Sequence, residues 1–116
     1  MSEWITLLEE KDLKGYEPGE IISLELETDD GMSLPIALVH DPSAEHNWIA
    51  FQNVCTHDGA GMEEGYIDLG ECSIECPRHG AQFNMKTGKV MSMPAAHDIK
   101  TFPVRMDNVN LQIQLP

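Results

Sequence analysis

The sequence predicts an all-β protein, with an antiparallel base formed by both ends of the chain and a loop-rich insertion between them. Apolar runs are short and bounded by turn-forming residues, which is typical of strands. Signals for helices are poor throughout. Between about residues 54 and 85, five of the nine glycines gather without a clear strand pattern. These three observations favour strands at the two ends of the chain and loops in the middle.

Residues 20–27 give the clearest strand signal. Ile22, Leu24 and Leu26 fall on one face and polar side chains on the other, the pattern of a half-buried strand. The turn signal at residues 29–31 predicts that residues 34–39 return antiparallel. The other elements expected here are a short strand at 4–8, a loop at 14–19, a polar turn at 40–47 and a strand at 48–54 that leads directly to Cys55.

The second half carries weaker strand signals. Residues 82–84 and 89–91 flank a turn at 86–88, and residues 99–105 and 109–115 predict a final hairpin around Asp107 and Asn108. No internal repeat is visible. At 116 residues, the chain is large enough for one core and too small for two, so a single domain over 1–116 is expected.

The charge of the chain is strongly negative and uneven. Residues 1–75 hold eighteen acids and two lysines, a balance of −16, whereas residues 76–116 hold two acids and five bases, a balance of +3, which together give the net −13. This charge serves solubility or steers the protein toward a basic partner. Nucleic acid is disfavoured as a partner, because phosphate binding requires a basic surface.

Composition also bears on the cellular location. No apolar run approaches the roughly 18–20 residues of a membrane span, and the first residues lack the pattern of a signal peptide. The chain has three cysteines, a small and odd number, so a disulfide framework is not expected. A soluble, cytoplasmic protein without membrane contact is therefore expected.

Two short ligand-bearing segments stand out. Cys55 and His57 are separated by one residue, Cys76 and His79 by two, and eighteen residues lie between the pairs. Two thiolates and two imidazoles suit either a tetrahedral zinc ion or an iron–sulfur centre with mixed ligands. The Cys-x-His pair is shorter than the usual zinc spacing, which makes zinc the weaker alternative but leaves it open.

The residues around these ligands resemble a known family. Residues 55–59, Cys-Thr-His-Asp-Gly, and residues 76–83, Cys-Pro-Arg-His-Gly-Ala-Gln-Phe, closely resemble the two cluster-binding loops of Rieske proteins. The resemblance implies the Rieske fold, with a β-sandwich-like base at about 1–53 and 97–116 and an inserted cluster-binding subdomain at about 54–96.

The same resemblance implies one Rieske-type [2Fe–2S] cluster per chain. Cys55 and Cys76 would bind one iron, and His57 and His79 the outer iron near solvent. Gly59 and Gly80 would let backbone amides approach the bridging sulfides, and residues 92–96, Ser-Met-Pro-Ala-Ala, would form the proline-containing loop that covers the cluster.

Four residues depart from the Rieske subunits of respiratory and photosynthetic complexes. Those subunits join their two loops by a disulfide, and the equivalent positions here are Ala60 and Arg78. They also place a Ser and a Tyr hydroxyl near the cluster, where this chain has Ala81 and Phe83. Missing donors leave more negative charge on sulfur, so we expect a midpoint potential toward the low end of the range of about −150 to +300 mV.

The function that this resemblance implies is that of a soluble one-electron carrier, similar to the ferredoxin component of ring-hydroxylating dioxygenase systems. Its partners would be a flavin-dependent ferredoxin reductase and a terminal oxygenase, which would dock near His57 and His79. The chain would be a monomer and an electron-transfer component of an oxidoreductase system, without catalysis of its own. Two alternatives remain: the Rieske-like small subunit of a reductase such as nitrite reductase, and a zinc-stabilised binding module.

Other chemically distinctive residues receive structural roles. Cys72 matches no ligand position and is expected to be a free, partly buried thiol. The remaining side chains fall into three groups. Surface positions are expected for His40, His46 and His97, core positions for Trp4, Trp48, Phe51 and Phe102, and packing around the site for Met62, Met85, Met91 and Met93, with Met62 or Met93 as candidates for a partner contact.

Overall fold

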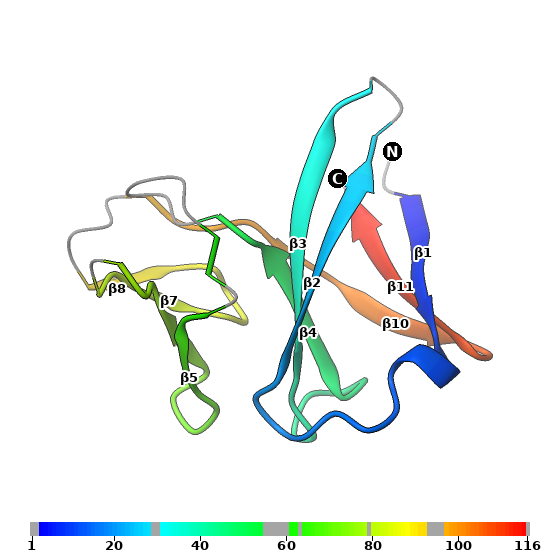
Figure 1. The fold of residues 1–116 in the computed structure, drawn as a ribbon, viewed down its shortest axis with the longest axis horizontal. Helices are drawn as coiled ribbons and strands as arrows, with labels where there is room; N and C mark the ends of the chain where they lie inside the picture. Colours follow the sequence, from blue (N-terminus) through cyan, green and yellow to red (C-terminus); the bar gives the residue numbers. More distant parts are fainter. Residues whose placement is uncertain are drawn as a thin grey trace.

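The computed structural model describes residues 3–28, 31–54, 61–62, 64–78, 80–92 and 97–115. Its strands form three antiparallel sheets, so the predicted all-β class is confirmed (Figure 1). One sheet contains β1 (Glu3–Glu9), β11 (Asn110–Leu115) and β10 (Val104–Asp107) in that order. A second contains β2 (Ile21–Glu27), β3 (Ser33–His40), β4 (Trp48–Gln52) and β9 (Thr101–Phe102). The third contains β5 (Tyr66–Asp68), β6 (Ser73–Glu75), β7 (Gln82–Asn84) and β8 (Val90–Ser92).

The first two sheets are called the base here, and the third the inserted sheet, because all four of its strands lie between β4 and β9 in the chain. Figure 1 shows the inserted sheet beside the base, with the chain leaving the base after β4 and returning to it at β9. The first and last strands, β1 and β11, pair with each other within the base, as expected.

The predicted hairpin at residues 20–39 is confirmed. β2 and β3 pair antiparallel from Ile21 with Val39 to Glu27 with Ser33. The alternation of β2 has the predicted phase, because Ile22, Leu24 and Leu26 pack against the core of the base while the residues between them are exposed. This period-2 pattern arises because successive side chains of a strand point to opposite faces.

The central strands β3 and β4 are buried on both faces. Ile36 and Leu38 of β3 belong to the core between the two sheets of the base, whereas Ala37 and Val39 belong to the core shared with the inserted sheet. β4 alternates in the same way: Trp48 belongs to the core between the two sheets of the base, and Ile49 to the core shared with the inserted sheet. A strand covered on both faces is a continuous apolar run, which is why residues 36–39 and 48–51 are apolar without alternation.

The segment expected to be loop-like up to about residue 85 contains β5 and β6, so that expectation was wrong in this respect, whereas the strands predicted around the turn at 86–88 are confirmed as β7 and β8. Ile67, Ile74, Phe83 and Val90 lie opposite one another in a row across the four strands of the inserted sheet and pack toward the base. Each strand has three residues, so each gives only one inward-facing apolar side chain. A single apolar residue has no period, which is why the sequence pattern did not indicate β5 and β6.

The C-terminal hairpin is confirmed, with one difference in its first limb. β10 pairs with β11 around Asn108, whose φ of 55° places it in the left-handed region favoured by Asn in tight turns. The limb predicted as one strand at 99–105 is divided at Pro103, and β9 pairs with β4 of the other base sheet. Pro cannot donate a ladder hydrogen bond, so the break falls where the chain moves between sheets.

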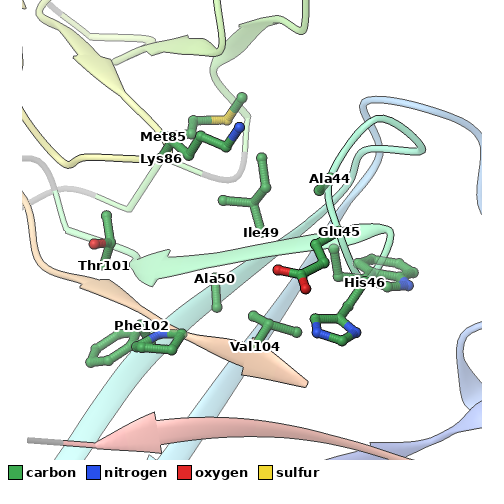
Figure 2. Close-up of a pocket in the computed structure, with 12 residues that line it drawn as sticks. Ala44, Glu45, His46, Ile49, Ala50, Met85, Lys86, Thr101, Phe102 and Val104 are labelled. Atoms are coloured by element: carbon green, nitrogen blue, oxygen red, sulfur yellow. The ribbon is translucent and has the colours of Figure 1, made fainter. Parts of the chain in front are cut away.

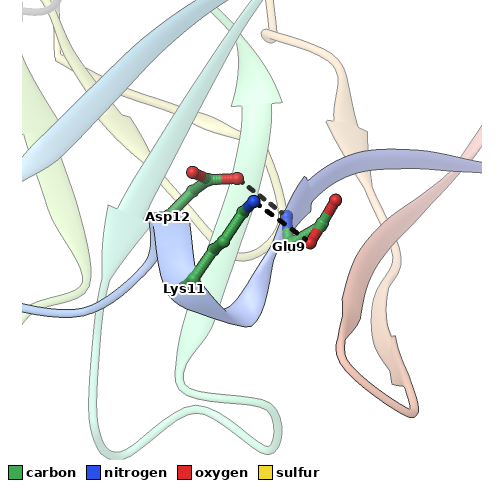
Figure 3. A network of polar contacts seen from close by, with 3 residues as sticks. All are labelled: Glu9, Lys11 and Asp12. Atoms are coloured by element: carbon green, nitrogen blue, oxygen red, sulfur yellow. Dashed lines mark hydrogen bonds and ion pairs between the residues drawn. The ribbon is translucent and has the colours of Figure 1, made fainter.

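A single 3₁₀ turn, η1 (Glu10–Asp12), follows β1 and was not predicted. The backbone N–H of Glu9 donates to Asp12 Oδ2 at 3.2 Å, and Lys11 Nζ lies 3.8 Å from Glu9 Oε2 (Figure 3). These groups are exposed, so the ion pair contributes at most about 1 kcal/mol to stability. Within the described ranges, no helix is long and apolar enough to cross a bilayer.

The aromatic and histidine predictions are confirmed in part. Trp48, Phe51 and Phe102 are buried, whereas Trp4 is only half-buried and carries the Arg105 guanidinium 4.2 Å above its ring. His40 was expected in a surface turn. It is instead the last residue of β3, half-buried, with its ring 5.0 Å from that of Trp48.

Candidate metal centre

Of the four predicted ligands, the structure describes Cys76. Cys55, His57 and His79 lie outside the described residues, as do Gly59 and Ala60. Within the described part of the chain, no three His, Cys, Asp or Glu side chains come close enough to hold a metal ion. The described part of the site consists of Cys76 and the residues that flank the other three predicted ligands.

Cys76 directly follows β6 and is almost fully buried, with 1% of its surface exposed. Its N–H donates to the carbonyl of Ala81 at 2.7 Å, and its own carbonyl accepts from the N–H of Gly80 at 3.1 Å. These two bonds close a tight turn between β6 and β7. The thiol belongs to no disulfide. A buried, unpaired thiol at the start of a closed turn fits a thiolate ligand of an iron–sulfur centre.

Gly80 turns the chain with a φ of +77°, in the left-handed region that glycine enters without strain. The turn is therefore specified partly by this residue, which the sequence had singled out beside the predicted ligand His79.

Asn53 fixes the ends of the segment that carries Cys55 and His57. Its N–H donates to the carbonyl of Pro35 at 3.0 Å, which ties it to β3. Its Oδ1 accepts the N–H of Met62 at 2.7 Å, so the chain before and after residues 55–60 is joined by one side chain. Asn53 is itself buried, at 6% exposure.

The ligand-bearing segments are connected to one end of the inserted sheet. Tyr66, Glu75, Gln82 and Ser92 lie opposite one another in a row across its four strands. The chain enters this row from residues 61–65, makes the Cys76 turn between its second and third members, and leaves it for residues 93–96. The strand register thus brings together the residues that follow the first predicted ligand pair, the Cys76 turn, and the start of the predicted covering loop.

Two further contacts join the residues after the first predicted ligand pair to the Cys76 turn. Met62 belongs to the same buried cluster as Cys76 and Ala81. Gly65 lies so close to Glu75 that a Cβ on it would stand 2.3 Å from the Glu75 carbonyl oxygen. The segment after the first ligand pair therefore packs directly against the strand that leads to the second. For the predicted covering loop, Gln82 N–H donates to Ser92 Oγ at 3.1 Å, while Met93, Pro94, Ala95 and Ala96 lie outside the described residues.

Three described residues stand where the Rieske subunits of respiratory and photosynthetic complexes have a disulfide cysteine or a hydroxyl donor, and they differ in burial. Arg78 is exposed, whereas Ala81 and Phe83 are fully buried in the cluster that contains Cys76. Two apolar side chains thus stand on the buried side of the Cys76 turn, where the resemblance places hydroxyl groups.

An open acidic groove of about 610 Å³ lies on the outer face of the inserted sheet. Asp68, Glu71 and Glu75 line it together with Tyr66 and Met91, which are 80% and 45% exposed. Gln82 Nε2 donates to Glu75 Oε1 at 2.8 Å. Glu75 directly precedes Cys76, whereas Asp68 and Glu71 lie toward the other end of the sheet, so the outer face of the inserted sheet is negative along its length.

Cys72 is a free, half-buried thiol, as predicted. Met62 and Met85 are fully buried, which confirms their packing role. Burial also excludes Met62 from contact with a partner, so that suggestion was wrong.

A second hollow, of about 280 Å³, lies where the inserted sheet meets the base. Figure 2 shows Met85 and Lys86 on one side of it and Glu45 and His46 from the β3–β4 turn on another. Met85 follows β7, at the end of that strand opposite to the Cys76 turn, so this hollow is separate from the ligand-bearing segments.

Sequence reasoning missed Asn53 and gave Gly65 no individual role. A polar residue at the end of the apolar run 48–51, two positions before a predicted ligand, was the available signal for Asn53. Gly65 had no local signal, because its contact with Glu75 depends on the register of two strands.

Comparisons with known proteins give a consistent result. The family model of the Rieske [2Fe–2S] domain matches residues 3–103. The ferredoxin component of the naphthalene 1,2-dioxygenase system of Pseudomonas putida is 42% identical over 66 residues, which cover 57% of this chain and 62% of the relative. The chain thus matches about three fifths of the length of such curated relatives.

Solved structures share the fold along most of their length. The Sphingomonas yanoikuyae B1 ferredoxin aligns with a TM-score of 0.75 at 26% identity, over 98% of this chain and 100% of that one. A chain in the complex of reduced oxygenase and oxidised ferredoxin of carbazole 1,9a-dioxygenase aligns with a TM-score of 0.73 at 28% identity, over 95% and 91%. The putative NADH-dependent nitrite reductase small subunit of Mycobacterium tuberculosis shares the fold, with a TM-score of 0.74 at 20% identity over 100% and 97%.

Proposed function

Because the chain belongs to the family of Rieske [2Fe–2S] domains, we propose that it is a one-electron carrier between a reductase and an oxygenase. The cofactor is a Rieske-type [2Fe–2S] cluster. The observation that carries the proposal is Cys76, a buried and unpaired thiol in a closed turn, at the end of the inserted sheet where the ligand-bearing segments begin.

The proposed ligands are Cys55 and Cys76 for one iron and His57 and His79 for the other. A cluster held by these two thiolates and two imidazoles would supply one-electron redox chemistry at the site. The domain division goes with this assignment: residues 54–96 form the cluster-binding subdomain, and residues 1–53 and 97–116 the base.

The chain's own residues hold and shield this centre. Met62, Ala81 and Phe83 share a buried cluster with Cys76 and exclude water from its inner side. They offer no hydroxyl to sulfur, so negative charge there is stabilised less, which supports a potential at the low end of the family range.

The proposed partners are a flavin-dependent ferredoxin reductase and a terminal oxygenase, by analogy with the ferredoxin components among the relatives. Glu75 beside Cys76 and the negative net charge of the chain support docking of a basic surface at the cluster end, near His57 and His79. We also propose that the chain acts as a cytoplasmic monomer.

Purification and a reductive titration test this function. The protein should be red-brown, contain about two irons and two acid-labile sulfides per chain, and take up one electron per cluster. It should then pass that electron to an oxygenase of the naphthalene dioxygenase type. A colourless protein with one zinc would contradict the proposal. Copurification with a nitrite reductase large subunit, and no transfer to any oxygenase, would favour the reductase subunit instead.

A further inference from the structure

Asn53 is the residue at which the base meets the first ligand-bearing segment. Its backbone N–H bonds to Pro35 of β3, and its Nδ2 donates to Ser23 Oγ of β2 at 3.2 Å. Its Oδ1 accepts the N–H of Met62 at 2.7 Å, in a buried bond that spans the sequence between them. Asn53 therefore links Met62 to two strands of the base, to β3 through its backbone and to β2 through its side chain.

The connection continues from Met62 to the second ligand-bearing segment. Met62 is fully buried, and its carbonyl accepts the N–H of Gly65 at 2.9 Å. Gly65 lies against the backbone of Glu75, the residue before Cys76. A chain of hydrogen bonds and one close backbone contact thus runs from Asn53 to the start of the Cys76 turn.

In this series of contacts, the hydrogen bond from Met62 N–H to Asn53 Oδ1 is the one that a side-chain substitution can remove. A buried N–H that loses its acceptor keeps the full cost of its desolvation, so Met62 would be driven to move toward solvent or another acceptor. Any such movement alters the distance between the two ends of the segment 54–61. It also shifts Gly65, which has no free space against Glu75.

We propose that Asn53 is a positioning residue for the cluster: through Met62, it holds the segment of Cys55 and His57 in register with the segment of Cys76 and His79. This inference rests on the ligand set of the proposed function. It assigns to Asn53 the retention and geometry of the cluster, beyond its contribution to the stability of the base.

The test compares Asn53→Leu with Asn53→Asp in the cluster-loaded protein. Leucine offers no acceptor to Met62, whereas aspartate retains an oxygen at that position. Cluster loss to an iron chelator is followed by visible absorbance, and the geometry by the electron paramagnetic resonance spectrum of the reduced protein. Unfolding of the base is followed by fluorescence, because both tryptophans, Trp4 and Trp48, lie in base strands.

We expect Asn53→Leu to lose its cluster at least tenfold faster than wild type and to have a changed resonance spectrum. Asn53→Asp should stay within about threefold of wild type, with the original spectrum. If Asn53→Leu does not fold, Asn53→Ser replaces it, since its shorter side chain cannot reach Met62 N–H.

Asp41→Ala is the matched control for general destabilisation. Asp41 is buried at 5% exposure and accepts bonds from the N–H and hydroxyl of Ser43 in the β3–β4 turn, away from the ligand-bearing segments. Asp41→Ala should lower the unfolding midpoint of the base while leaving the resonance spectrum unchanged.

Two outcomes overturn the inference and are distinguishable. A wild-type protein without iron and sulfide refutes the ligand set, and the role of Asn53 with it. A wild-type protein with its cluster, in which Asn53→Leu loses that cluster no faster than Asp41→Ala or Asn53→Asp, refutes the positioning role alone.

Discussion

Cys76 and Cys72 are both free cysteines, but their surroundings differ. Cys76 begins the turn that Ala81 and Gly80 close, with almost no exposed surface. Cys72 lies in the turn before β6, half-buried, in the left-handed region with a φ of 53°. The closed turn and burial suit Cys76 to a role as a cluster ligand, whereas the surroundings of Cys72 do not.

This contrast gives a matched pair of substitutions. Cys76→Ser should reduce the iron content from about two per chain to near zero, because a hydroxyl is a poor replacement for a thiolate ligand. Cys72→Ser should retain the full iron content and the visible spectrum. Iron and sulfide analysis of the two purified proteins checks this. Equal iron content in both would remove Cys76 from the ligand set.

Phe83 offers a test of how the buried surroundings tune the potential. Phe83→Tyr adds a hydroxyl to a fully buried side chain of β7, in the same buried cluster as Cys76. A new hydrogen bond to sulfur stabilises the more negative, reduced state, so the potential should rise. A neutral bond worth about 0.5–1.5 kcal/mol corresponds to roughly 20–65 mV for one electron. Spectroscopic redox titration measures the shift, and an unchanged or lower potential would contradict the argument.

At the scale of secondary-structure elements, the decisive feature is the register of four short strands. Tyr66, Glu75, Gln82 and Ser92 share a row, so the segments that lead to and from them start at one end of the sheet. The sequence predicted the long strands well, because β2 alternates and β3 and β4 are continuous apolar runs. It did not predict β5 and β6, since three-residue strands form through pairing with distant neighbours and leave no periodic trace.

Gly65 tests the close contact between these elements. A Cβ there would meet the carbonyl oxygens of Glu75 and Met62 at 2.3 and 3.0 Å, and backbone atoms cannot move aside easily. Gly65→Ala should therefore cost about 1–3 kcal/mol of unfolding free energy and speed cluster loss. The control is Gly70→Ala, whose Cβ would meet only the Asp68 carboxylate, at 3.3 Å. Chemical denaturation with equal midpoints for the two variants would contradict the contact.

At the scale of the whole molecule, charge should govern the encounter with a partner. The net −13 is unevenly distributed, and the described acids near the Cys76 turn include Glu64 and Glu75. Long-range steering accelerates association with a basic protein and is screened by salt over about 8–10 Å. Docking at the cluster end would make these two acids more important than others of equal charge.

Electron transfer to the basic protein cytochrome c, followed by stopped flow, checks this. The double variant Glu64→Gln, Glu75→Gln should slow the second-order rate by about two- to fivefold at low salt. Its control, Glu25→Gln, Glu27→Gln, removes the same charge from exposed positions on β2 of the base and should slow it less. Both differences should vanish at high salt. Equal slowing by the two pairs would show that net charge alone determines the rate.

The sequence by itself determined the chemistry of this protein. The proposed ligand residues and their neighbours lie within short stretches of chain, where spacing and residue type are read directly, and the longer strands carry their own apolar pattern. The tertiary structure decided what depends on distant residues: the burial of Cys76, the link from Asn53 to Met62, and the common end of the inserted sheet from which the ligand-bearing segments start. Pairing register and burial arise from contacts between segments far apart in the chain, so no local pattern specifies them.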